Sequence, residues 1–217
     1  MKIVNGWAFP DADQFMVEEL NYQDGSYQRT HLEAALKRCK KFRTAIDGGA
    51  HIGTWSRIMS RSFKSVLAFE AASDTYDCLV WNMDNANCAN VYPRYKALGD
   101  RPGRVRITLD GDEANQQRQN TGARHAAPGD EVDVITIDSL ELGDLDFLKL
   151  DIEGSEPAAL RGARGTLLRC KPVVLFEDKK LWTKHYGEPK DACVSILKEL
   201  GMVHLERVGC DQIWGWK

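Results

Sequence analysis

The amino-acid sequence predicts a single α/β domain, in which helices cover both faces of a mostly parallel β-sheet. Short apolar runs alternate with helix-like segments from residue 42 to residue 201, and this alternation is typical of parallel sheets. Two further apolar runs, 202–208 and 212–217, are joined by a tight turn and predict a final antiparallel hairpin. A chain of 217 residues with 43% hydrophobic and 28% charged residues has the size and composition of one such domain.

Five apolar runs are predicted to form the parallel strands, because turn residues bound each of them. They are residues 42–49, 64–70, 90–100, 145–151 and 171–177. Pro93 predicts that the third strand lies near an edge of the sheet, since proline lacks a backbone donor for the ladder.

Five segments with apolar residues at helical spacing are predicted to be helices. They are residues 26–39, 51–62, 74–86, 155–169 and 188–201. Ser26 and Ser73 are candidate N-caps. Pro157 lies in a first helical turn, and Gly201 ends the last helix.

The middle of the chain is predicted to carry an insertion, residues 101–138. Two segments within it, 103–110 and 131–138, alternate like strands and flank a polar loop, 111–130. A loop of about twenty residues inside a compact domain is usually functional or disordered. We therefore expect either a binding loop or a linker here.

Composition argues against several other classes of protein. The net charge of −3 gives no basic footprint for duplex nucleic acid. No apolar run approaches the ~18 residues of a membrane span, and no signal-peptide pattern is found. The six cysteines lack metal-binding spacing, so we expect a reduced, cytoplasmic protein. The single domain, 1–217, is divided into an N-terminal extension with a helix, 1–41, and a core, 42–217.

Residues 45–56, AIDGGAHIGTWS, place a carboxylate and three glycines in a predicted strand-to-helix turn. When Gly53 is aligned with the last glycine of the dinucleotide fingerprint G-x-G-x-x-G, Ala50 replaces the central glycine. Asp47 would also face a diphosphate, at a cost of ~4 kcal/mol per like-charge contact at ~4 Å and a dielectric of ~20. The turn thus disfavours a nicotinamide-dependent oxidoreductase, which remains an alternative.

S-adenosylmethionine (SAM) reverses this argument, because it has a cationic end and no phosphates. Asp47 can attract its ammonium and sulfonium, and the helix after Gly53 can receive its carboxylate. Glu70, at the end of the next predicted strand, is placed to accept hydrogen bonds from both ribose hydroxyls. The alternative is a tight turn whose glycines serve packing alone.

The loop after the third strand, residues 96–100, is expected to lie beside the adenine. The residues predicted to contact SAM are Asp47, Gly48, Gly49, His51, Gly53, Thr54, Glu70, Ala71, Ala97, Leu98 and Gly99.

The stretch 147–163, FLKLDIEGSEPAALRGA, is the most specific in the chain. A buried strand rarely contains a lysine without a partner, and Lys149 and Asp151 point to the same side of the predicted strand. Glu153 follows just past its end, so a lysine and two acids are concentrated at the catalytic edge of the sheet. The alternative is a buried ion pair that only stabilises the strand.

These motifs resemble those of the FkbM-type methyltransferases, a branch of the class I SAM-dependent enzymes. The resemblance extends from about Tyr27 to Glu177, and its most distinctive part is the pattern K-x-D-x-E-G-x-E. Gly48 departs from the family, which more often has valine there. The pattern is carried here by Lys149, Asp151, Glu153, Gly154 and Glu156.

The resemblance implies a seven-stranded Rossmann-like sheet, SAM as methyl donor, no metal, and an oxygen acceptor on a sugar or natural product. It also implies that Asp151 lies near the methionine part of SAM and that Tyr27 and Gln28 cover the cofactor. The residues that would hold the cofactor by position are Asp47, Gly49, Gly53 and Glu70.

An alcohol acceptor needs a base near the methyl group, because it loses its proton on transfer. We predict that Asp151 or Glu153 takes this proton and that Lys149 tunes or positions that carboxylate. The acceptor, a small molecule, is expected to contact Asn120, Arg124, His125, Glu177 and His185. A SAM-binding partner module without turnover is a further alternative, and the sequence does not predict the oligomeric state.

Overall fold

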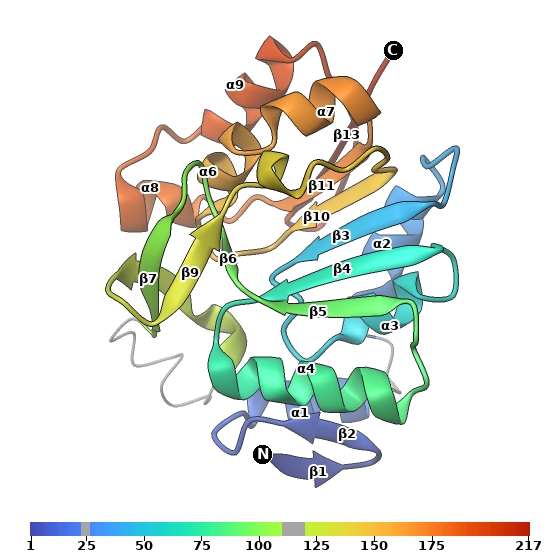
Figure 1. Cartoon of the computed structure of the whole chain (residues 1–217), viewed down its shortest axis with the longest axis vertical. Coiled ribbons are helices and arrows are strands. Elements are labelled where there is room, and N and C mark those ends of the chain that lie inside the picture. Colours follow the sequence, from blue (N-terminus) through green and yellow to red (C-terminus); the bar gives the residue numbers. More distant parts are fainter. Residues whose placement is uncertain (23–26, 110–119) are drawn as a thin grey trace.

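A seven-stranded sheet forms the centre of the molecule in the computed structural model, which describes residues 1–22, 27–109 and 120–217 (Figure 1). The strand order is β12-β13-β11-β10-β3-β4-β5, with β13 antiparallel to both of its neighbours and the other pairs parallel. The bounds are Thr44–Gly48 (β3), Ser65–Glu70 (β4), Val91–Tyr95 (β5), Phe147–Leu150 (β10), Val173–Glu177 (β11), Val203–Val208 (β12) and Asp211–Gly215 (β13). The predicted fold class is confirmed, and Pro93 lies on the edge strand β5 as expected.

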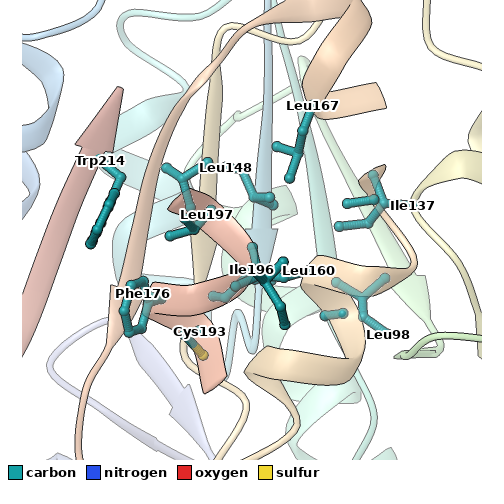
Figure 2. Packing of buried hydrophobic residues seen from close by; sticks show 14 of the residues in the cluster. Leu98, Ile137, Leu148, Leu160, Leu167, Phe176, Cys193, Ile196, Leu197 and Trp214 are labelled. Atoms are coloured by element: carbon teal, nitrogen blue, oxygen red, sulfur yellow. The ribbon is translucent and has the colours of Figure 1, made fainter. Parts of the chain in front are cut away.

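Helices cover both faces of this sheet, as Figure 1 shows. One face carries α2 (Arg29–Leu36), α3 (Thr54–Met59) and α4 (Ser73–Asn85). The other carries α6 (Glu156–Arg161), α7 (Arg164–Cys170) and α9 (Ala192–Glu199). On this second face Leu148 and Phe176 of the strands pack against Leu160, Ile196 and Leu197 of the helices (Figure 2). The burial of apolar side chains on both faces explains why these strands appear in the sequence as continuous apolar runs.

The helix predicted over residues 155–169 is broken into α6 and α7 at Gly162. A Cβ on Gly162 would lie 2.0 Å from the carbonyl oxygen of Gly99, so the chains approach closely here. The carbonyl of Gly162 accepts a hydrogen bond from the backbone N–H of Asp138 at 2.8 Å. The Asp138 carboxylate then accepts from the N–H groups of Gly165 and Thr166, at 2.9 and 2.7 Å, and caps α7.

Other helix boundaries also differ from the prediction. α2 begins at Arg29, after Gln28 in the left-handed conformation, and the proposed cap Ser26 lies outside the described residues. Ser73 is the first residue of α4 instead of its N-cap. A further helix, α8 (Leu181–Tyr186), has no counterpart in the sequence prediction.

The insertion forms a second sheet together with β6, with strand order β6-β9-β7-β8. The strands are Ala97–Leu98 (β6), Gly103–Thr108 (β7), His125–Pro128 (β8) and Val132–Ile135 (β9), and short 3-10 turns span Thr121–Ala123 and Asp138–Leu140. β8 was predicted as part of a polar loop, and that prediction was wrong because these residues pair antiparallel with β7. Residues 111–119 of the same loop lie outside the described residues, as does residue 110 before it.

The N-terminal extension adds a hairpin of β1 (Lys2–Val4) and β2 (Trp7–Phe9), and helix α1 (Phe15–Tyr22). Asn82 of α4 joins this hairpin to the core. Its side-chain oxygen accepts from the Ala8 N–H at 2.7 Å, and its amide donates to the carbonyls of Ala8 and Ile52 at 3.0 and 2.9 Å. In the part of the chain that the structure describes, we find no helix with the length and hydropathy of a membrane span.

Replacing Asn82 with alanine is expected to lower the free energy of unfolding by about 2–4 kcal/mol, because three buried backbone groups lose their partner. Urea denaturation measures this loss. Asn85→Ala on the same helix is the control, since the exposed Asn85 makes a single 3.2 Å hydrogen bond to Gly6. Equal losses in the two variants would contradict the proposed attachment of the hairpin.

Candidate active site

A cavity lies at the carboxyl ends of β3, β4, β10 and β11, the edge at which open parallel sheets bind ligands. The turn after β3 and the residues after β10 contribute much of its lining. The N-terminal extension contributes Phe15 and Met16, and the insertion contributes Ile107 and Ala126. Segments that are distant in the sequence therefore form a single site.

The turn after β3 touches the end of β10. Gly49 has φ of +73°. A Cβ on it would lie 1.8 Å from the carbonyl oxygen of Asp151, so no other residue fits this position. The backbone N–H groups of Gly49 and Ala50 donate to the carbonyl of Phe69 on β4, at 3.0 and 2.9 Å. The turn is thereby fixed to both of the strands that flank β3.

Asp47 does not reach the cavity, which corrects the expectation that it attracts a ligand directly. Its side chain is fully buried beneath the turn. One carboxylate oxygen accepts from the Ser56 hydroxyl at 2.6 Å, and the other lies 3.1 Å from Lys149 Nζ. Asp47 is therefore neutralised by an internal cation, and its charge cannot decide which ligand the turn accepts.

Lys149 is buried on β10 and lines the cavity from below the turn. Its ammonium donates to the carbonyl of Gly49 at 2.7 Å and lies 4.0 Å from the Asp151 carboxylate. Burial alone would lower the pKa of Lys149, but the charges of Asp47 and Asp151 outweigh burial and raise it. Paired with these carboxylates, the lysine holds the turn against the end of β10.

Glu70, at the end of β4, organises the other side of the turn and faces the cavity. One of its oxygens accepts from the backbone N–H of His51 at 2.9 Å. The other accepts from the N–H groups of Ala71 and Ala72, both at 2.8 Å. The oxygen bonded to His51 has a second lone pair, so Glu70 keeps acceptor capacity for a ligand hydroxyl at that oxygen.

Three carboxylates gather beyond the ends of β10 and β11. Oxygens of Asp151, Glu153 and Glu177 lie within 4.8 Å of one another, in an arrangement that could hold a metal ion. Burial, followed by the charge of Asp151, raises the pKa of Glu153 to about 8 and that of Glu177 to about 10. Lys179 lies against this group, with Nζ 2.8 Å from Glu177 and 3.6 Å from Glu153.

A hydrogen-bond network joins the turn to the N-terminal extension and the insertion. His51 Nε2 lies 2.9 Å from the Thr121 hydroxyl and 3.4 Å from the buried carboxylate of Asp13. The Thr121 hydroxyl also donates to Asp13. Burial raises the pKa of Asp13, but the hydrogen bonds and charge of His51 outweigh it and lower that pKa. The wall of the cavity is thus fastened by buried polar groups.

Most of the residues predicted for the site line the cavity. They are Tyr27, Gln28, Gly49, His51, Thr54, Glu70, Ala71, Ala97, Leu98, Asn120, Arg124, Lys149, Asp151, Glu153 and Glu177. The predicted residues outside the lining are Asp47, Gly48, Gly53, Gly99, His125 and His185.

Packing explains why these residues lie outside the lining. Gly53 lies against the side chains of Leu79 and Met83 on α4, which helps to hold that helix against the turn. His125 and His185 stack on each other, with ring centroids 3.9 Å apart, and this contact fixes β8 to α8. Gly99 approaches Gly162 at the junction of α6 and α7. These contacts give Gly53, Gly99 and the two histidines roles in packing, and their contacts with a ligand stay predictions.

Sequence reasoning missed several residues of the lining. They are Phe15, Met16, Trp55, Phe69, Lys96, Ile107, Ala126, Ile152, Ser155 and Lys179. Lys179 could have been found, because it lies two residues beyond the acid that ends β11. Phe15 and Met16 could not have been predicted to line the cavity, since the N-terminal extension has no recognisable motif.

Lys149→Met is expected to lower the free energy of unfolding by about 3–5 kcal/mol, because it leaves the buried Asp47 without its cation. Urea denaturation of the two single variants and of the double variant with Asp47→Asn measures the coupling. The double variant should lose less than the two single variants together. Strictly additive losses would contradict the ion pair as the support of the turn.

Comparisons with known proteins agree with this geometry. A family model described as the methyltransferase FkbM domain matches residues 47–202. No curated protein matches the chain significantly.

Solved structures of methyltransferases superpose on the chain. Methyltransferase FkbM from Methylobacillus flagellatus does so with a TM-score of 0.54 and 16% identity, over 97% of this chain and 56% of that one. A SAM-dependent methyltransferase from Aquifex aeolicus has a TM-score of 0.51 and 12% identity, over 94% and 97% of the two chains. An O-methyltransferase from Bacillus cereus, in complex with S-adenosylhomocysteine, has a TM-score of 0.50 and 15% identity, over 95% and 91%.

These structural similarities establish the class I Rossmann-like methyltransferase fold. They establish the fold alone, because the sequence identities are low. This chain spans only 56% of the Methylobacillus protein. The family model, in contrast, covers well over half of this chain and includes the glycine turn, Glu70 and the acids after β10. The chain belongs to the FkbM methyltransferase family.

Proposed function

We propose that the protein transfers a methyl group from SAM to a hydroxyl oxygen of a small-molecule acceptor, such as a sugar or other natural product. The observation that carries this proposal is the distribution of charge in the cavity. Glu70 lies at the end of β4, and Asp151, Glu153 and Glu177 lie at the ends of β10 and β11. A ligand with ribose hydroxyls at one end and a cationic group at the other matches this distribution.

The basic residues of the cavity support the same choice. Each lysine or arginine among the described lining residues already lies within 4.0 Å of a carboxylate. None of them is therefore left without an ion pair to bind a diphosphate. These pairs are Lys96 with Asp133, Arg124 with Asp74, Lys149 with Asp47, and Lys179 with Glu177. This argument replaces the one from Asp47 and disfavours a nicotinamide dinucleotide.

The lining residues fit SAM in chemistry. Glu70 would accept from its ribose hydroxyls, and Ala97 and Leu98 would pack beside its adenine. Asp151 would face its cationic methionine end, next to a turn in which Gly49 lets the backbone come close. When bound, SAM supplies a methyl group that its sulfonium already activates.

The remaining task of the protein is to align the acceptor and remove its proton. Asp151 and Glu153 both lie at the cavity, and Asp151 is the more exposed, with 30% of its side chain accessible. Either carboxylate is a candidate base, since the acceptor oxygen would lie between the methyl group and the acids. Lys149 is committed to Asp47 and Gly49, so it supports the site and does not exchange the proton.

SAM and S-adenosylhomocysteine are expected to bind one molecule per chain in isothermal titration calorimetry, and NAD is not. Glu70→Ala should weaken SAM binding by about tenfold or more, because the ribose loses a charged acceptor. Glu33→Ala, at an exposed position on α2, is the control and should bind as the unchanged protein does. Binding of NAD in preference to SAM would refute the proposed function.

The double variant Asp151→Asn/Glu153→Gln is expected to lose at least about 100-fold in kcat, because neither amide side chain can accept the proton of the hydroxyl. A screen of hydroxylated small molecules with radiolabelled SAM would identify the acceptor and provide the assay. The exposed Glu199→Gln is the control. Full turnover by the double variant would rule out both carboxylates as the base, and failure of every acceptor class would favour a SAM-binding module without turnover.

A further inference from the structure

Lys179 is a cation at the active site to which neither the sequence motifs nor the family pattern assigns a role. It lies in the segment between β11 and α8, two residues beyond Glu177. Its stem is partly exposed, with 45% of the side chain accessible, but its ammonium points inward. Nζ lies 2.8 Å from Glu177 Oε1 and 3.6 Å from Glu153 Oε1.

The two glutamates need such a cation because of where they lie. Glu153 is 9% exposed and Glu177 is 6% exposed, and Asp151 adds a third carboxylate within 4.8 Å. Burial and like charges both favour protonation of carboxylates. Lys149 is 4.0 Å from Asp151, but it is already bonded to Asp47 and the Gly49 carbonyl. Within the described residues, Lys179 is the cation that forms ion pairs with both glutamates.

The position of this ammonium also bears on metal binding. The three carboxylate oxygens are close enough to hold a divalent ion. However, Lys179 already lies against two of them, and an ion in the same place would have to displace it. The chain thus supplies its own counter-charge at the position where a metal would otherwise balance the acids.

We propose that Lys179 is a positioning residue of the methyl-transfer site, whose ammonium holds the side chains of Glu153 and Glu177 in place at the cavity and favours their ionised form. The inference rests on the proposed function, because an ionised carboxylate matters here as the acceptor of the substrate hydroxyl proton. On methyl transfer the C–S bond breaks, the C–O bond forms, and the proton of the hydroxyl passes to the carboxylate. A protonated Glu153 could not accept that proton.

The charges around Glu153 and Glu177 determine in which direction their pKa values change when Lys179 is removed. Even with Lys179 in place, Glu153 has a pKa of about 8 and Glu177 a pKa of about 10. The lysine lowers both values, and its own pKa is raised by the two glutamates against the effect of burial. Removal of the ammonium should therefore move both glutamates further toward the neutral form. Among the described residues, the other titratable groups that act on Glu153, Glu177 or Asp151 include Tyr27, Lys149, Glu156 and Asp211.

Titration of side-chain carboxyl groups by ¹³C NMR tests this inference on the full chain without SAM. Glu153→Gln and Glu177→Gln assign the two signals. In Lys179→Met, at least one of the two pKa values should rise by about one unit or more. Lys179→Arg retains the charge and should keep both values within about half a unit. Lys180→Met removes the neighbouring exposed lysine and should change neither value.

Unchanged pKa values of both glutamates in a folded Lys179→Met variant would overturn the inference, as would equal shifts in Lys180→Met. Because this titration needs neither SAM nor acceptor, its outcome is separate from that of the calorimetry. Once an acceptor is identified, the pH dependence of kcat can be measured. Its acidic limb should move to higher pH in Lys179→Met and should lie at its original pH in Lys179→Arg. An unmoved profile would also count against the inference.

Discussion

The active site depends on the contact between the turn after β3 and the end of β10. The absence of a side chain at Gly49 lets the turn rest on the backbone of Asp151, and the Lys149 ammonium bonds the Gly49 carbonyl from below. Lys149 needs Asp47 as its counter-charge, because both groups are buried. This contact fixes the distance between the ends of β4 and β10, and hence the position of Glu70 relative to the acids.

The acids at the strand ends have two different roles, and burial separates them. Asp47 is enclosed and paired, so it supports the turn. Asp151, Glu153 and Glu177 line the cavity, where they can meet a cationic ligand. The same residue type at the same edge of a sheet can therefore serve structure or chemistry, depending on whether an internal cation reaches it first.

The sequence was sufficient for the order of the elements and for the glycine turn, because both depend on local patterns. The alternation of strands and helices and the motif from Lys149 to Glu156 needed no knowledge of distant contacts. The direction of the Asp47 side chain could not be predicted from the sequence, since it depends on a lysine from a strand about a hundred residues later. The break at Gly162 depends on Asp138 in the same way, and Asp13 and Phe15 join the site only through tertiary packing.

The central claim is that this contact creates a SAM site between Glu70 and the acids after β10. A crystal structure with S-adenosylhomocysteine tests it most directly. We expect the ribose hydroxyls within hydrogen-bonding distance of Glu70 and the homocysteine end beside Asp151, with Lys149 still bonded to Asp47. A nucleoside bound away from Glu70, or a homocysteine end directed away from Asp151, would contradict the account.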